Sequence, residues 1–390
     1  MTDIDDQLRE DFHHLATRYQ GDDEPPKSVL LGVRHRRRAT GIGLATVTGA
    51  AVVAIVLAAT SVTNLESPRP QPTHPAGAGL PAGQFVGLRP SRSDVYAWTF
   101  SATTGRPVQR LAKALAVVGI TADRRRVLIA QYRGMVCTVG VSYLLVSVTT
   151  GEITRPFPAA YHVTSAAVGG QTAVGVAATL APSGSGGCGS GDPPRSVPGS
   201  QTLLVRDLST GQLRSYPIPS VFGDALQFGD VLQTGGVAAV SPDGRWAVLV
   251  NRPANSDHQT AYLVSIDPGV TSLHGTEIRA APPGCLPPVK YRSPYDAFAF
   301  RPSNQLTVNR FCGRTMTIID YDPAAKRQAA AVGIPDPPGL PVTYFTTSWD
   351  RTGTDAMVET VKANGAARKI YILRDGGLHP INTEAYEVTW

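Results

Sequence analysis

The feature that most constrains this chain is a strand–turn–strand unit that returns six times after residue 84. One copy reads LLVRDLSTGQLRSYPI at 203–218, where two runs rich in apolar residues flank a short polar turn. The turn centres fall near residues 105, 151, 211, 269, 323 and 376. A second strand–turn–strand precedes five of these hairpins. Four strands in about 50 residues is the period of a β-propeller blade.

The two ends of this region predict how the ring closes. The first hairpin lacks the two inner strands of a blade, whereas 385–390 (AYEVTW) and 85–88 each read as a lone strand. Joining these two segments completes a sixth blade and removes free sheet edges. The sequence therefore predicts an all-β, six-bladed β-propeller over 84–390. Five or seven blades are the alternatives, because register slips easily in weak repeats.

An uncharged run at 39–63 predicts a transmembrane α-helix ahead of the propeller. A bilayer core of about 30 Å needs about 20 mostly apolar residues as a helix, because lipid leaves no backbone group solvated. The arginine-rich segment 34–38 precedes the run, so the N-terminus is predicted to be cytoplasmic and the rest extracytoplasmic. A cleaved signal is the alternative, since small residues near 58–61 would permit cleavage.

The predicted cytoplasmic tail, 1–38, contains an amphipathic helix. Its apolar residues recur at helical spacing; they are Ile4, Leu8, Phe12, Leu15 and Tyr19. A lone helix of this length is marginal in water, so the apolar stripe calls for a cytosolic partner or the membrane surface, and a weakly structured tail is the alternative. Beyond the anchor, 64–83 is rich in Pro and Gly and predicts an extended spacer.

One motif of the propeller region carries a family resemblance. Residues 241–246 (SPDGRW), followed by 263–267 (LVSID), resemble the blades of TolB-type and WD-repeat-like bacterial propellers. The resemblance covers about 84–390, although only this blade carries the full motif. The terminal Trp-Asp signature of WD repeats is missing, so the resemblance implies no particular partner. The layout of helix, arginine cluster, anchor and propeller is also similar to uncharacterised actinobacterial membrane proteins, some of them beside sigma factors.

The chain has four cysteines, an even number that favours two disulfides in an extracytoplasmic domain. They are Cys137, Cys188, Cys285 and Cys312. Propeller connectivity places all four on the face that carries the links between blades and between second and third strands. Cys137–Cys188 and Cys285–Cys312 are therefore the geometrically sensible pairs, each stabilising by roughly 2–4 kcal/mol if unstrained.

The same face receives the longest loops, at 179–200, 219–235, 276–295 and 333–342. Binding residues concentrate on loops held by a rigid scaffold, so this face is the predicted ligand surface. The candidate contacts are Arg252, His258, Tyr291, Arg292 and Arg310.

No catalytic, metal or cofactor motif stands out. Ser185 lies in a glycine-rich run without a G-x-S-x-G elbow, and the histidines of the propeller region never reach metal-ligand spacing. The net charge of +6 indicates a mildly basic, solvated surface. The sequence lacks the basic stripe with interleaved aromatic residues that would predict nucleic-acid binding.

Three functions follow in order of preference. The first is a non-enzymatic, membrane-anchored binding or scaffold module for a protein or cell-envelope component. The alternative is a transmembrane regulator whose cytosolic tail holds a partner such as a sigma factor. A propeller hydrolase is the further alternative, and it predicts several acidic or His side chains converging at the central channel.

Overall fold

The computed structural model describes residues 79–91, 94–133, 140–178, 201–219, 222, 236–251, 259–279, 296–312, 315–334, 337, 342–362 and 368–390. All of them belong to one compact unit, Pro68–Ala363 with Ala367–Trp390. The tail helix in 1–38, the apolar run 39–63 and most of the spacer lie outside the described residues. Within the described ranges, no helix has the length and apolar character needed to cross a bilayer.

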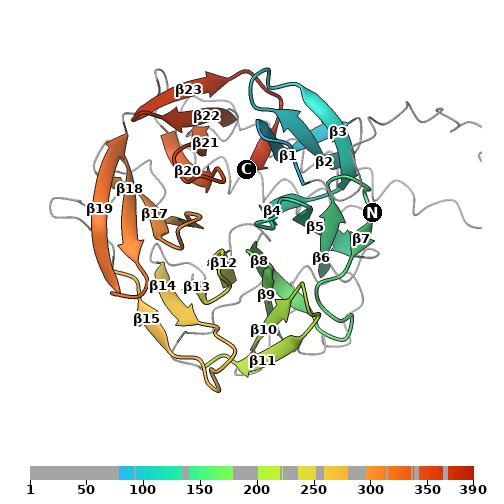
Figure 1. Ribbon diagram of the computed structural model, residues 1–390, viewed down its shortest axis with the longest axis vertical. Helices are drawn as coiled ribbons and strands as arrows, with labels where there is room; N and C mark the ends of the chain where they lie inside the picture. Colours follow the sequence, from blue (N-terminus) through green and yellow to red (C-terminus); the bar gives the residue numbers. More distant parts are fainter. Residues whose placement is uncertain are drawn as a thin grey trace, which may run out of the picture. The chain divides into compact units, whose positions relative to one another are not determined.

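The described residues form six antiparallel sheets of four strands, which are the blades in Figure 1. Blade 1 contains β24 (Tyr386–Thr389), β1 (Gln84–Ser91), β2 (Asp94–Ser101) and β3 (Pro107–Lys113). Blade 2 contains β4 (Ala116–Ile120), β5 (Arg126–Arg133), β6 (Gly140–Ser147) and β7 (Ile153–Thr154). Blade 3 contains β8 (Val163–Gly169), β9 (Thr172–Ala177), β10 (Thr202–Asp207) and β11 (Leu213–Pro217).

The remaining three blades follow in chain order. Blade 4 contains β12 (Gly236–Val240), β13 (Trp246–Asn251), β14 (Thr260–Ser265) and β15 (Gly275–Glu277). Blade 5 contains β16 (Ala297–Phe300), β17 (Leu306–Cys312), β18 (Thr315–Asp322) and β19 (Arg327–Ile334). Blade 6 contains β20 (Val342–Trp349), β21 (Ala356–Lys362), β22 (Arg368–Arg374) and β23 (Gly377–Ile381). In every blade the first-named strand is innermost and the last is outermost (Figure 1).

The ring closes by joining the two ends of the propeller region. The C-terminal strand β24 pairs antiparallel with β1, with Val86 opposite Thr389 and Leu88 opposite Tyr386. Each inner strand also contacts the inner strand of the next blade, from β24 through β4, β8, β12, β16 and β20 back to β24. The six-bladed, all-β prediction and its closure from both chain ends are therefore confirmed.

The hydrophobic core is divided among the joints between blades. Among the described residues, six buried clusters occur, and each contains residues from two neighbouring blades. At the closing joint, the stacked rings of Phe85 and Phe100, 5.3 Å apart, pack on Met357 and Ile370 of blade 6. Because both faces of a blade are covered in this way, the strands read as apolar runs rather than as a clean alternation.

The last residues of the predicted spacer are packed on the ring. Leu80 is 5% exposed and belongs to the core cluster between blades 1 and 2. Its backbone N–H donates to the carbonyl of Arg124 over 2.7 Å. The chain therefore enters the ring beside the turn that joins β4 to β5.

Candidate functional site: the loop face of the ring

The connections between strands divide the ring into two unlike faces. Links between first and second strands and between third and fourth strands lie on one side, which we call the turn face; none of them exceeds the nine residues between β14 and β15. Links between second and third strands and between blades emerge on the opposite side, which we call the loop face. The β9–β10 and β15–β16 links run from 178 to 201 and from 278 to 296, whereas the β8–β9 turn is 170–171. The longest connections of the ring are therefore on the loop face.

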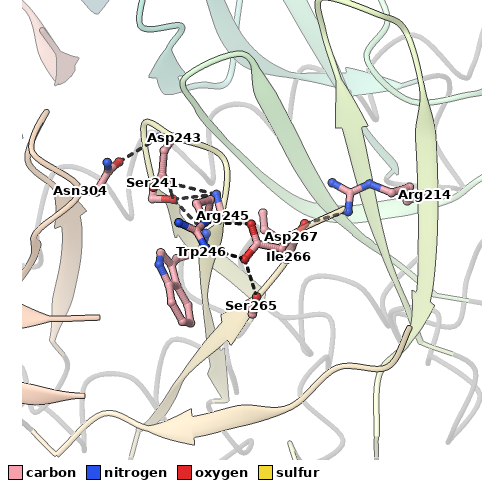
Figure 2. Close-up of polar contacts among 9 residues, drawn as sticks. All are labelled: Arg214, Ser241, Asp243, Arg245, Trp246, Ser265, Ile266, Asp267 and Asn304. Carbon is pink, nitrogen blue, oxygen red and sulfur yellow. Dashed lines mark hydrogen bonds and ion pairs between the residues drawn. The ribbon is translucent and has the colours of Figure 1, made fainter. Parts of the chain in front are cut away.

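The turn face is illustrated by the motif that carries the family resemblance (Figure 2). Ser241 Oγ donates to Asp243 Oδ1 over 2.5 Å and accepts the backbone N–H groups of Arg245 and Trp246. The Arg245 guanidinium pairs with Asp267 at 2.9 Å. The motif thus builds a tight turn, and its side-chain hydrogen bonds and ion pair lie within blade 4.

The same turn is bonded to both neighbouring blades. The side-chain oxygen of Asn304, in blade 5, accepts the Asp243 N–H over 2.9 Å. From blade 3, Arg214 donates to the carbonyl of Ile266 over 2.9 Å (Figure 2). On the blade 3 side, Gly170 has φ +58°, and a Cβ there would collide with the backbone of Pro242. The Gly169-Gly170 turn, which looks weak in the sequence, is therefore a close approach between blades.

Arginines join other blades on this face in the same way. Arg124 donates to the carbonyl of Gln84 over 2.6 Å, which connects blade 2 to blade 1. Arg126 donates to Gln171 over 2.9 Å, which connects blade 2 to blade 3.

Arg301 makes the most extensive of these joints. It pairs with Asp320 at 3.1 Å, lies 3.6 Å over the ring of Trp349 and donates to the carbonyl of Gly353 in blade 6. These arginines hold blades together, which leaves them engaged rather than free for a ligand.

On the loop face, the structure describes one of the five predicted contacts. Arg310 forms a two-point ion pair with Asp296, with N–O distances of 2.8 and 2.5 Å. The backbone N–H of Asp296 donates to Gln259 over 3.0 Å, and the Gln259 amide donates back to the Asp296 carbonyl. Arg310 therefore fixes the end of the β15–β16 link beside the start of β14. It positions a predicted binding loop instead of offering an unpaired guanidinium.

The other candidate contacts, Arg252, His258, Tyr291 and Arg292, lie outside the described residues. So do three of the four cysteines. Cys312, the last residue of β17, is disulfide-bonded. The two pairings stay predictions.

A small cavity opens at the loop-face ends of blades 3 and 4. Its walls include Phe222, Tyr262 and Ile218, and its volume is about 10 Å³, close to the minimum for one water. Asn251 lines it, and within the described part of the chain its buried Oδ1 has no hydrogen-bond partner. A cavity of this volume does not admit a ligand larger than water.

The inner strands bring one carboxylate to the closing joint. Among the described side chains of the six innermost strands, Glu387 of β24 is the only Asp, Glu, His, Lys or Arg. It shares Arg368 with the buried Glu359 at 3.5 and 3.3 Å, and the backbone of Val117 also bonds it. Burial raises the pKa of Glu387 to about 7, Arg368 opposes the rise and Glu359 adds to it. Two carboxylates share one guanidinium, so holding one proton is favourable there.

The described residues contain no cluster of His, Cys, Asp or Glu arranged to hold a metal ion. The convergence of several acidic or His side chains that a hydrolase predicts is not found on the described inner strands. Sequence reasoning missed the Glu359–Arg368–Glu387 group, because its members lie on separate strands and no local pattern marks them.

No family model matches the chain, and no curated protein matches it. TolB from Acinetobacter baumannii is 12% identical over 79% of this chain and 66% of its own, with a TM-score of 0.41. The acylaminoacyl peptidase of Pyrococcus horikoshii is 10% identical over 78% of this chain and 45% of its own, with a TM-score of 0.43. The propeller domain of the trilobed protease from Pyrococcus furiosus is 10% identical over 76% of this chain and 77% of its own, with a TM-score of 0.40. Two of these three proteins are named as a peptidase and a protease, and TolB is not. Similarity of fold therefore does not distinguish a binding function from a catalytic one.

Proposed function

We propose that this chain is a membrane-anchored, extracytoplasmic β-propeller that binds a protein or cell-envelope component through its loop face, without catalysing a reaction. The observation that carries the proposal is the contrast between the two faces. On the turn face, side chains such as Arg214, Asn304 and Arg301 bond to the backbone of a neighbouring blade, whereas the longest connections leave from the opposite face. A rigid ring that presents long loops on one side is suited to recognition.

The point at which the chain enters the ring supports this orientation. Leu80 joins the ring on the turn face, where its N–H bonds to the turn between β4 and β5. The predicted anchor ends at residue 63, so about 15 residues span the gap, with a typical reach of roughly 20 Å if flexible. A tether attached at the turn face leaves the loop face free to meet a ligand away from the bilayer.

The binding experiment uses the full chain in its membrane and a variant in which 179–200 is replaced by a short Gly-Ser turn. Partners are captured by mild cross-linking and quantified by mass spectrometry, with purified cell-wall fragments as a second probe. The account expects the wild type to retain a specific protein or wall fragment that the shortened variant loses. Equal retention by both, or capture of neither probe class by the wild type, would refute the proposal.

The anchor is tested separately by protease treatment of intact cells. The expected result is cleavage of the ring from outside, with the tail protected. A ring that resists protease in intact cells but not in lysed cells would place it on the other side of the membrane.

The regulator alternative makes a different prediction, which concerns the tail alone. Its apolar stripe would retain a cytosolic protein when residues 1–38 are used as bait, and substitution of Leu8 and Phe12 by Asp would release it. If the tail retains no protein, or if the substituted tail retains the same proteins as the wild-type tail, this alternative is wrong.

A further inference from the structure

The outermost strand of each blade leaves one row of backbone N–H and C=O groups without a strand partner. Such edges invite pairing with another chain, and proteins protect them with short strands, charges or proline. In this ring β7 has two residues and β15 has three. The strands β11 and β23 contain Pro217 and Pro380, and β3 carries Arg110 and Lys113.

The outer strand of blade 5 lacks these protections. β19 has eight residues, RQAAAVGI, and after Arg327 it contains neither a charge nor a proline. Six of the eight residues are exposed, and Val332, at 52% exposure, is among the most exposed large apolar side chains of the described chain. A bulge at Ala329 interrupts its pairing with β18, but from Ala330 to Ile334 the ladder is regular.

The geometry of this edge favours an added strand. Ile334 is buried at 1% exposure and β18 is buried behind β19, so the edge is held rigidly. The side chains at 329–331 are alanines, which let a neighbouring backbone approach to the 4.7–4.9 Å strand spacing. Lys326 and Arg327 supply positive charge at the start of the strand.

Size and symmetry argue against a second ring as the occupant. An edge of eight residues covers about 26 Å, and its one-sided burial falls short of the roughly 800 Å² per partner of a stable interface. Antiparallel pairing of β19 with its own copy would also turn the two loop faces in opposite directions. A single extended peptide has neither difficulty, since backbone hydrogen bonds supply its affinity.

We propose that the exposed edge of β19 is a second interaction surface, which binds an extended segment of a partner protein as a fifth, antiparallel strand of blade 5. The segment carries small or β-branched uncharged side chains. Its carboxyl end carries an acidic residue, because antiparallel pairing brings that end beside Lys326 and Arg327.

The test uses the full chain with a fluorescent peptide of sequence TVTVTE, and hydrogen exchange reports on β19. The expected result is saturable binding with Kd below about 1 mM, with slower exchange of the amides of 327–334. A peptide with Pro in place of its second Val loses binding, because Pro has no backbone N–H to donate to the strand ladder. A peptide that ends in Lys instead of Glu binds at least threefold more weakly.

Val332→Lys is the variant that closes the edge, and Val108→Lys on β3 is its matched control, since both valines are exposed on outer strands. Binding falls at least tenfold in the first and is unchanged in the second. Three results would overturn the proposal: no saturable binding to the wild type, equal loss in both variants, or protection of amides elsewhere than 327–334. A wild-type dimer that Val332→Lys dissociates would show that a second copy is the occupant instead.

Discussion

The two faces of the ring differ in their contacts and in the length of their connections, and we propose that recognition belongs to the loop face. On the turn face, side chains of one blade bond to the backbone of the next, as Arg301 does to Gly353 and Arg214 to Ile266.

On the loop face, Arg310 pairs with Asp296 and Lys113 with Asp94, each within one blade or at its entry. Bonds between blades occur there too, between Gln259 and Asp296 and from Gln131 to the carbonyl of Lys113. What distinguishes this face is the length of its connections, which reach 178–201 and 278–296. From this comparison we expect substitutions on the turn face to change the free energy of unfolding, and changes to the long loops to act on the proposed binding.

The largest expected effect comes from Gly170→Ala, which tests the closeness of blades on the turn face. The added Cβ meets the backbone of Pro242 and the φ of +58° is strained for Ala. Together these costs lower the free energy of unfolding by roughly 3–5 kcal/mol. The matched control is Gly151→Ala, where φ is +70° but nothing lies within 4 Å, so only about 1 kcal/mol is lost. Equal losses in urea unfolding of the two variants would mean that the blades do not touch there.

Arg301→Met tests whether a contact between blades contributes more to the free energy of unfolding than an exposed ion pair does. It removes the bond to Gly353 and leaves Asp320, 15% exposed, without its cation. We expect a loss of roughly 2–3 kcal/mol. Arg245→Met, in a pair whose side chains are 60% and 30% exposed, costs clearly less, because solvent screens exposed ion pairs. A cost for Arg245→Met as large as that for Arg301→Met would remove the distinction.

Glu387→Gln examines the closing joint by its pH dependence. The folded pKa of about 7 lies above the ordinary value of 4.5, so the folded state binds the proton more tightly. The carboxyl therefore stabilises the fold least above pH 7 and progressively more as pH falls toward 4.5. At pH 8 the Gln variant should be more stable by roughly 1–3 kcal/mol, with a much smaller difference near pH 4.5. Glu384→Gln, at an exposed carboxylate, is the control; a pH-independent gain in Glu387→Gln would contradict the assignment.

The smallest effect on stability is expected from shortening the 179–200 connection. Loop-closure entropy changes slowly with length, so the free energy of unfolding should move by less than about 1 kcal/mol. The same variant is the one expected to lose its partner, which would separate the loop face from the turn face within one molecule. A large loss of stability would show that this connection is part of the scaffold.

Much of the fold follows from local pattern. The motif 241–246 identifies a turn between strands because Ser, Asp and Gly have local hydrogen-bonding and backbone reasons to be there. The closing strand is also predictable, since AYEVTW had no partner strand left except 85–88. The exposed β19 edge is visible as an uncharged run, although only the fold reveals that it is outermost.

The site was less predictable because its contacts join distant parts of the chain. Arg301 reads locally as an ordinary turn residue, and only the ring brings it to Gly353 and Trp349. Glu359 and Glu387 meet because β24 returns to the first blade. Arg310 was predicted as a ligand contact, but Asp296 lies in the link before β16 and occupies its guanidinium. No periodicity in the sequence marks such pairs.

The most direct test of the two-face account is site-specific photo-cross-linking of the full chain in its membrane. A photoreactive side chain is placed at Ser91 or Tyr161 on the loop face, and at Thr103 or Ser209 on the turn face; all four residues are exposed. The account predicts a discrete cross-linked partner from the loop-face positions and none from the turn-face positions. Cross-links of equal yield from both faces, or from the turn face alone, would contradict it.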